Sequence, residues 1–207
     1  MTSSKKYFAK VAKKWDEIRA GYFTEEVREI AIAKADLSSE MIVADVGTGT
    51  GFIAIGLAPL VKKVYCIDNS PEMLKVAKRN LRKFKNIELK LADGQNIPLQ
   101  DERLDAVFAN MYLHHSPDPL AAIKEMMRIL KPGGRLIITD ADKHNYEWMR
   151  EEMADIWLGF DREQIKTWFS QAGLKEIRVD CTGSDCCSAS HTGEKVAISI
   201  FVATGIK

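Results

Sequence analysis

The residues best suited to bind a ligand lie in one short stretch, Asp45-Val46-Gly47-Thr48-Gly49-Thr50-Gly51. An apolar, β-branched run ends at Asp45, glycines alternate after it, and an apolar pattern at helical spacing begins at Phe52. This order predicts a strand, a tight loop and a helix. Glycines leave the backbone bare, so a ligand can lie directly against it. Open α/β sheets bind nucleotide-like ligands at such a loop, outside the carboxyl end of the strand.

The details of this loop disfavour ligands that bind through phosphate. The dinucleotide-binding fingerprint needs a glycine where this chain has Phe52, and a phosphate-binding loop needs a lysine, which is absent between Asp45 and Leu60. The pattern Asp-x-Gly-x-Gly-x-Gly resembles motif I of the class I S-adenosylmethionine-dependent methyltransferases, in particular the small-molecule type 11 or UbiE-like branch. The cofactor that this resemblance implies, S-adenosylmethionine, carries no phosphate. A nicotinamide-dependent oxidoreductase is the rival enzyme class.

Two further acidic residues follow the next two strand-like runs. Asp68 ends the first of them, where a carboxylate can accept hydrogen bonds from both ribose hydroxyls; capping the next helix is its alternative role. The stretch from Leu91 to Pro98 is similar to a family motif, and the resemblance implies that Asp93 and Gly94 contact the adenine. The predicted cofactor-binding residues are Asp45, Gly47, Thr48, Gly49, Asp68, Asn69, Met73, Asp93, Gly94 and Asn110.

The turn after the fourth predicted strand holds residues suited to catalysis. We expect this turn to form the far wall of the crevice, because the strand order reverses between the first and fourth strands. His114 or His115 would act there as a general base, since an imidazole accepts protons near neutral pH; a structural role in the helix cap is the alternative. Asp140 either polarises a substrate hydroxyl or caps the chain that follows. Methyl transfer from a sulfonium is an in-line displacement, so many such sites need no base.

Aromatic residues near the N-terminus are predicted to cover the ligand. Residues 5–35 have the pattern of two helices, with apolar side chains on one face and lysines around them. In the family that the chain resembles, the N-terminal region caps the cofactor pocket, which would make Tyr7, Trp15 and Tyr22 lid residues. A packed amphipathic helix with a solvated basic face is the alternative.

A second cover is predicted near residues 143–160, a mixed aromatic and charged insertion. We expect a helical lid that places His144 and Trp148 against the substrate; packing in the core is the alternative. The predicted organisation is an N-terminal helical cap over residues 1–40 and a methyltransferase domain over residues 41–207 that carries the lid.

Three of the four cysteines lie close together after the sixth predicted strand. Cys181, Cys186 and Cys187, with His191 nearby, offer soft ligands for zinc or for a metalloid such as trivalent arsenic. We place them in a loop from Cys181 to Gly193 that emerges on the crevice side. Two interpretations follow: the chain is a metalloid methyltransferase that uses these thiols, or the cysteines are inert residues of a loop. We predict no resident metal.

The remaining pattern predicts one α/β domain. Strand-like and helix-like stretches alternate from Met41 onward, which indicates parallel strands joined by right-handed crossovers, and the last two strands are close enough to form an antiparallel hairpin. The expected fold is a Rossmann-like, seven-stranded sheet, six strands parallel and one antiparallel, with helices on both faces. The predicted strands are 41–46, 63–67, 87–91, 104–110, 135–139, 176–180 and 196–203, and the core helices lie near 52–60, 73–84, 119–130 and 161–171.

Composition excludes several classes of partner. The 207 residues include 30 Lys and Arg against 29 Asp and Glu, so no net field attracts nucleic acid or an anionic membrane. No apolar run reaches the roughly 18 to 20 residues that span a bilayer, and no signal peptide is recognisable. We expect a cytoplasmic monomer or homodimer that methylates a small molecule. A noncatalytic S-adenosylmethionine-binding regulatory module is the non-enzyme alternative.

Overall fold

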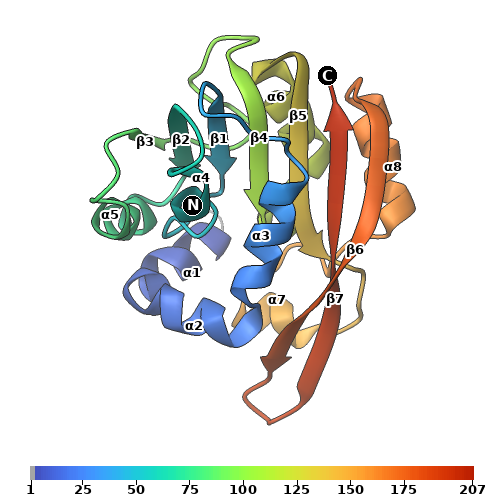
Figure 1. The fold of residues 1–207 in the computed structure, drawn as a ribbon. Helices are drawn as coiled ribbons and strands as arrows, with labels where there is room; N and C mark the ends of the chain where they lie inside the picture. Colours follow the sequence, from blue (N-terminus) through green and yellow to red (C-terminus); the bar gives the residue numbers. More distant parts are fainter. Residues whose placement is uncertain (1–2) are drawn as a thin grey trace.

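The computed structural model describes residues 3–207, which fold around one seven-stranded sheet of order β3-β2-β1-β4-β5-β7-β6 (Figure 1). β7 runs antiparallel to both of its neighbours, and every other adjacent pair is parallel. The predicted sheet of six parallel strands and one antiparallel strand is therefore confirmed. The strands are β1 (Ile42–Val46), β2 (Lys63–Asp68), β3 (Ile87–Leu91), β4 (Leu104–Asn110), β5 (Leu130–Ala141), β6 (Lys175–Ala189) and β7 (Lys195–Ile206).

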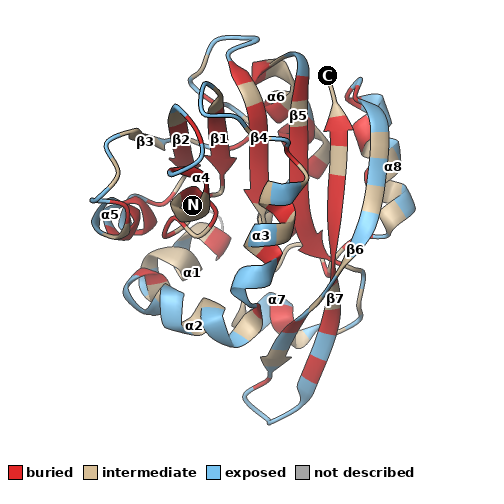
Figure 2. Cartoon of the chain, in the orientation of Figure 1, coloured by how far each residue is buried: buried red, intermediate tan, exposed pale blue. Residues whose placement is uncertain are grey.

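Helices cover both faces of this sheet, and each face has its own apolar core. Helices α3 (Glu25–Ala33), α4 (Ala54–Leu57) and α5 (Pro71–Asn80) pack on one face. Helices α6 (Pro119–Ile129) and α8 (Arg162–Gln171) pack on the other. The central strands are buried from both sides, as Figure 2 shows, because residues that alternate along a strand enter opposite cores.

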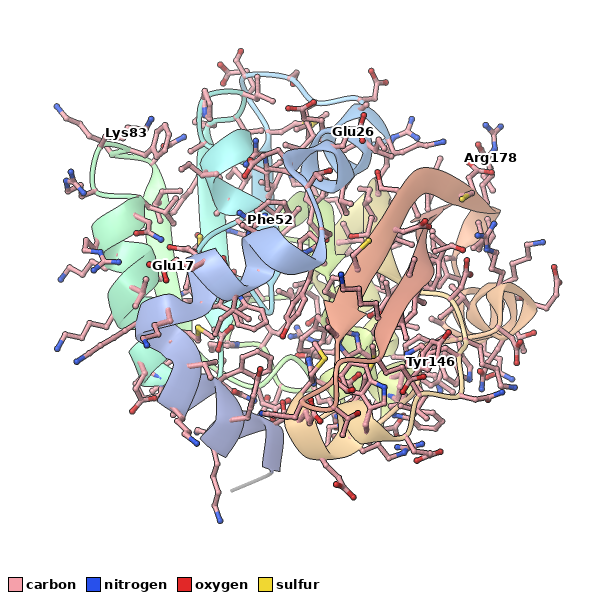
Figure 3. The ribbon with its side chains drawn as sticks, turned by 90° about the horizontal axis from the view of Figure 1, so that it is seen from below. Glu17, Glu26, Phe52, Lys83, Tyr146 and Arg178 are labelled. Carbon is pink, nitrogen blue, oxygen red and sulfur yellow. The ribbon has the colours of Figure 1, made fainter. Side chains whose placement is uncertain are left out.

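The first part of the chain lies across the carboxyl ends of the central strands. Helix α1 (Ser3–Val11), the short 3-10 helix η1 (Ala12–Lys14) and helix α2 (Trp15–Tyr22) cover this end, and Figure 3 looks onto it from below. Helix α3 instead packs on the sheet, where Ala31 joins the core that contains Val43 and Ala54. The segment placed over the crevice is therefore shorter than the 1–40 cap expected from sequence.

The C-terminal hairpin is longer than predicted, and this corrects the cysteine hypothesis. Cys181, Cys186 and Cys187 lie within β6, whose pairing with β7 continues to Ala189 opposite Lys195. Apolar residues of the extended hairpin, such as Ile198, pack against Phe23 and Met149, which explains why the strands continue. Cys186 is buried, whereas Cys181 and Cys187 are exposed.

Because Cys186 and Cys187 are consecutive in a strand, their side chains point to opposite faces. Among residues 3–207, the one group of three or more His, Cys, Asp and Glu side chains close enough to share an ion contains no cysteine. The soft-ligand cluster and the metalloid alternative built on it therefore have no support in the structure.

The insertion near residues 143–160 is mostly loop. Its helix, α7 (Trp148–Glu152), is a single short turn that packs beside the hairpin. Two backbone amides further along, those of Ile156 and Trp157, donate to the carbonyl of His114, each at 3.0 Å. They fasten the insertion to the 3-10 helix η2 (Leu113–His115). Among the helices of residues 3–207, none combines the length and apolar character needed to cross a bilayer.

Candidate active site

A large cavity opens at the carboxyl ends of β1, β2 and β4, beneath α1 and α2. It encloses about 940 Å³, counting the part open to solvent. The glycine-rich loop forms one wall, the ends of β2 and β4 form others, and aromatic residues of the first two helices close it. Of the predicted cofactor-binding residues, the cavity is lined by Gly47, Thr48, Gly49, Asp68, Asn69, Met73, Asp93, Gly94 and Asn110.

Asp68 holds the glycine-rich loop as well as facing the cavity. Its Oδ2 accepts a hydrogen bond from the Gly49 amide and its Oδ1 accepts one from the Ser70 amide, both at 2.8 Å. The backbone φ angle of Gly49 is +53°, a conformation that residues with a side chain rarely adopt. A Cβ atom added here would also project into the cavity, toward Trp15. Burial raises the pKa of Asp68 above its ordinary value, while these backbone donors favour the charged form.

Asp45 does not line the cavity, which corrects its predicted role as a direct cofactor ligand. Its side chain is buried, and Oδ2 accepts hydrogen bonds from Thr48 Oγ1 at 2.6 Å and from the Ala54 amide at 3.1 Å. Burial raises the pKa of Asp45 to about 7. This carboxyl group therefore ties the loop to the first turn of α4, behind the surface that a ligand would contact.

Tyr112 is a lining residue that the sequence analysis missed. A Cβ added at Gly47 would lie 2.4 Å from the Tyr112 ring, and one added at Gly94 would lie 2.1 Å from its hydroxyl oxygen. The Tyr112 ring therefore packs directly against the backbone at both glycines, and a side chain at either position would collide with it. Asp93 lies beside it, exposed in the cavity wall, with Oδ1 accepting a hydrogen bond from the Gln95 amide at 3.0 Å.

The cap is fastened to the glycine-rich loop by a polar contact. Asp16 of α2 accepts hydrogen bonds from Thr50 Oγ1 at 2.6 Å and from Asn80 Nδ2 at 2.9 Å. Arg19, one turn further along, places its guanidinium 4.3 Å from the centre of the Phe52 ring. Phe52 thus supports the cap, and Figure 3 shows the Phe52 side chain beside α2, where this helix crosses the glycine-rich loop.

A second, smaller cavity adjoins the first one and encloses about 350 Å³. Tyr7 and Tyr22, predicted as lid residues, line this second cavity, and the predicted Trp15 lines both. The two cavities also share Phe8, Phe23, Met111 and His115, so they have a common wall. The other residues that line the second cavity are His114, Met153 and Cys186.

His114 lines the second cavity and is fixed from behind by Asp140. Its Nδ1 lies 2.7 Å from Asp140 Oδ1, and Asp140 also accepts hydrogen bonds from the amides of Leu113 at 2.9 Å and Ala141 at 2.8 Å. Burial alone would lower the pKa of His114, but the attraction of Asp140 outweighs it and raises the pKa to about 9. Asp140 is fully buried and lines neither cavity, so it positions His114 and does not touch a substrate, contrary to the prediction.

His115 lies in the wall between the cavities in a different environment. Its Nδ1 is 3.3 Å from the carbonyl oxygen of Ala154, and its ring meets Phe8 edge-on with the centroids 4.8 Å apart. Burial and the neighbouring His114 lower the pKa of His115 well below its ordinary value. The two surroundings thus favour the neutral form of His115 and the charged form of His114 at pH 7.

Two predicted substrate residues lie elsewhere. His144 and Trp148 line neither cavity. The His144 ring stacks on Tyr146, with the centroids 5.4 Å apart, and Trp148 packs with the residues that support the hairpin. The insertion instead places a different residue behind the cavity wall, beside His114, because its loop and not its helix approaches η2. That residue is Asp155, whose Oδ1 lies 3.9 Å from both His114 Nε2 and His115 Nδ1.

Comparison with known proteins agrees with this geometry. Residues 44–138 match the model of the methyltransferase domain family. The chain is 30% identical over 184 residues to demethylmenaquinone methyltransferase of Staphylococcus haemolyticus, covering 73% of this chain and 75% of that protein. The chain belongs to the class I S-adenosylmethionine-dependent methyltransferases.

Other members of this methyltransferase family are similar over different lengths. The chloroplastic 2-methyl-6-phytyl-1,4-hydroquinone methyltransferase of Spinacia oleracea is 32% identical over 170 residues, which cover 80% of this chain and 49% of that protein. The chain spans about half the length of the plant relatives it matches. A SAM-dependent methyltransferase from Aquifex aeolicus superposes with a TM-score of 0.69 at 25% identity, covering 96% of this chain and 97% of that one.

The first cavity suits the cofactor of this methyltransferase family. Acidic side chains and bare backbone amides line it, which match the hydroxyls and the base of a nucleoside. Arg19 is the one lysine or arginine in its described lining, and its guanidinium donates to the Phe23 carbonyl and to Glu25. The donor set therefore fits an adenosyl group without phosphate better than a dinucleotide.

We expect the variant Asp16→Ala to weaken S-adenosylmethionine binding by about 10-fold. The substitution removes both hydrogen bonds that join α2 to the glycine-rich loop and to α5, so the cap is held less firmly over the cavity. Isothermal titration calorimetry measures the affinity. Glu17→Ala, an exposed acid on the same helix, is the matched control and should bind as the wild type does. Equal affinities for the two variants would contradict this role of Asp16.

Stability should fall as the pH rises from about 6.5 to 9. The folded pKa of His114, about 9, lies above the ordinary value near 6.5, so its contribution is complete below pH 6.5 and is lost as pH approaches 9. The loss amounts to about 3 kcal/mol in the free energy of unfolding, measured by urea denaturation at both pH values. In Asp140→Asn most of this difference should disappear. A wild-type stability that is flat across this range would show that His114 is not charged in the folded protein.

Proposed function

We propose that this chain transfers the methyl group of S-adenosylmethionine to a small acceptor bound in the second cavity. The observation that carries the proposal is the pair of adjoining cavities with a common wall, one lined by the glycine-rich loop and acidic residues and one by aromatic side chains. A donor and an acceptor bound in these cavities would meet at the wall formed by Phe8, Met111 and His115.

Within the first cavity, each part of the cofactor would have its own partners. Asp68 would accept hydrogen bonds from the ribose hydroxyls, and Asp93 with the Gly94 amide would contact the adenine edge. The loop at Gly47 and Gly49 and the end of β4 at Asn110 would hold the amino-acid part. When bound, the cofactor supplies a methyl group already activated as a sulfonium. The chain's task is to align the acceptor and to exclude water, which the cap of α1 and α2 supports.

The second cavity supports a hydroxyl-bearing aromatic acceptor. Its walls are mainly aromatic and sulfur-containing side chains, and its polar groups include the hydroxyls of Tyr7 and Tyr22 and the imidazole rings of the two histidines. Asp140 and Asp155 are buried next to it, so an anionic acceptor such as a free carboxylate would be repelled. The spinach relative is named for a hydroquinone, an acceptor of the class proposed here.

The proposed setting is a reducing compartment such as the cytoplasm, with the chain acting as a monomer or homodimer. All four cysteines are free thiols, which supports this setting. Neither the compartment nor the oligomeric state is needed for the chemistry proposed.

Calorimetric titration of the full chain with S-adenosylmethionine, S-adenosylhomocysteine and NADH tests the cofactor. We expect binding of the first two and none of NADH; the reverse would overturn the proposal in favour of an oxidoreductase. Transfer of a labelled methyl group to a panel of phenols and hydroquinones then tests the activity. Tight cofactor binding without transfer to any acceptor in a wider screen would favour a regulatory module.

A further inference from the structure

The net charge of +1 conceals a separation of charge within the chain. Residues 3–14 and 71–85 together hold 11 Lys and Arg residues and one acid, Glu72, so they carry a formal charge of +10. The rest of the chain must then carry −9, because the total is +1. A net charge near zero therefore does not describe the electrostatic field at each face of this protein.

Tertiary structure brings the two basic segments together. Apolar side chains of α1 and η1, among them Phe8 and Ala12, pack against Met73 and Val76 of α5. Figure 3 shows α1 and α5 beside each other, with Lys83 at the outer edge of the molecule. We call the exposed cations of these helices the basic face. From α1 and η1 it includes Lys6, Lys10, Lys13 and Lys14. From α5 and the turn after it, it includes Lys75, Lys78, Arg79, Arg82, Lys83 and Lys85.

The charges of the basic face are not balanced from within the protein. None of these cations forms an ion pair with a carboxylate of residues 3–207. Some are spaced four residues apart on one helix, such as Lys6 and Lys10 or Lys75 and Arg79, where like charges repel. The first turn of α1 also holds no acid, although an acid there would stabilise the helix. The basic face therefore favours a partner that brings negative charge from outside.

The basic face lies on the outer side of helices that close both cavities. Tyr7 and Phe8 of α1 line the second cavity, and Met73 of α5 lines the first. A partner on the basic face is therefore separated from the cavities by the thickness of one helix, about 10 Å. Docking at this face would place the cap, and no other part of the molecule, against the partner.

The composition of the basic face favours an anionic lipid surface over other polyanions. Its cations are mostly lysines, which are flexible point charges suited to a layer of headgroups, whereas bidentate recognition of a single phosphate uses arginine. Within residues 3–207 the exposed large apolar side chains are Leu60 and Leu91, and neither belongs to the basic segments. The basic face thus offers no exposed ring on which a nucleic-acid base could stack and no apolar centre for a protein interface.

We propose that the basic face docks the cap onto a bilayer that contains anionic phospholipid, and that the acceptor comes from this bilayer. The lysines would lie in the headgroup layer, with no segment of the chain crossing the membrane. The aromatic and sulfur-containing walls of the second cavity fit an acceptor that partitions into lipid. The source of the acceptor rests on the proposed function, whereas the docking itself does not.

Co-sedimentation of the full chain with lipid vesicles tests the docking. At about 0.1 M NaCl we expect at least about 30-fold tighter binding to phosphatidylcholine vesicles that contain about 30% phosphatidylglycerol than to pure phosphatidylcholine vesicles. The difference should vanish at about 1 M NaCl, because salt screens the attraction between exposed charges. Equal binding to both kinds of vesicle at low salt would overturn the proposal. Tighter binding to a DNA duplex than to the anionic vesicles would also overturn it, because the basic face would then fit nucleic acid.

Two triple variants test whether the basic face carries this binding. Each removes three lysines from one part of it: Lys10→Gln/Lys13→Gln/Lys14→Gln from α1 and η1, and Lys75→Gln/Lys78→Gln/Lys83→Gln from α5 and the turn after it. Each lysine near an anionic bilayer contributes about 5-fold in affinity, so each triple variant should bind the anionic vesicles about 100-fold more weakly. An effect of one triple variant alone would contradict a single face formed by both helices.

The matched control is Lys124→Gln/Lys175→Gln/Lys195→Gln, which removes the same charge from exposed positions on α6, β6 and β7. Figure 1 shows β6 and β7 at the opposite edge of the sheet from α5. The control should bind the vesicles as the wild type does. A loss equal to that of the triple variants would mean that net charge alone, and not the basic face, governs the binding.

Two further measurements separate docking from folding and from the proposed function. The melting temperatures of both triple variants should equal or exceed that of the wild type, because the substitutions remove repelling charges. Their affinity for S-adenosylmethionine should be unchanged, since none of the substituted lysines lines a cavity. A triple variant that loses S-adenosylmethionine as well would show that its lysines hold the cap, and would overturn the assignment. In the wild type, absence of vesicle binding overturns the docking alone, and absence of S-adenosylmethionine binding overturns the proposed function alone.

Discussion

Replacing Asp68 by alanine should weaken S-adenosylmethionine binding by at least about 100-fold. The carboxylate would be the partner of the ribose hydroxyls, and charge-assisted hydrogen bonds of this kind contribute about 1.5–3 kcal/mol each. The same carboxylate accepts hydrogen bonds from the Gly49 and Ser70 amides, so its removal also releases the glycine-rich loop. Both effects act on the same cavity, which is why this substitution should have the largest effect on affinity.

Calorimetry of the purified variant measures this loss, with circular dichroism to verify the fold. Glu88→Ala is the control, because Glu88 lies on the neighbouring strand β3, pairs with Lys63 and Lys90, and lines neither cavity. It should bind the cofactor with wild-type affinity. An Asp68→Ala variant that binds within about 5-fold of wild type would mean that the ribose lies elsewhere.

Replacing His114 by leucine should lower the free energy of unfolding by about 3 kcal/mol at pH 7. The change leaves the Asp140 carboxylate buried without its cationic partner, and breaking a buried ion pair from one side has costs of this order. The backbone amides of Leu113 and Ala141 still donate to Asp140, which keeps the effect near the lower end of the usual range. Urea denaturation with a constant m-value measures the difference.

His144→Leu provides the matched comparison for this prediction. His144 lies half-buried, stacked on Tyr146, and its pKa is lowered by burial, so it is neutral at pH 7 and forms no ion pair with a buried acid. Its loss should change stability by less than about 1 kcal/mol. Equal destabilisation by the two substitutions would show that ring packing, and not the ion pair with Asp140, accounts for the role of His114.

The residues that the structure does bring to the cavity wall could be located from local features of the chain. The strand, glycine-rich loop and helix from Ile42 to Leu57 follow from a β-branched run, a backbone that requires glycine and an apolar helical pattern, all within a few residues of one another. Asp68 could be placed because it ends a strand, and parallel strands bring their carboxyl ends to one edge. Cap residues such as Trp15 were predicted through the family resemblance.

The errors arose where a side chain's surroundings come from distant segments. Asp45 has the spacing of a ligand residue, but Thr48 and Ala54 bind its carboxyl group behind the loop. The cysteines are adjacent in sequence, yet strand pairing with β7 turns Cys186 inward and leaves Cys187 exposed. Neither outcome depends on the residue itself; each depends on what packs against it.

Local sequence patterns thus determined the succession of strands and helices along the chain, the glycine-rich loop and the position of Asp68 at the end of β2. Neighbouring residues impose those backbone conformations. Only tertiary structure decided which side chains enclose the second cavity. Asp155 lies in an irregular loop with no periodicity to identify it, and it reaches His114 because backbone amides of the insertion bind the η2 carbonyl. Such contacts join segments far apart in the chain, and the spacing of residues along the sequence carries no record of them.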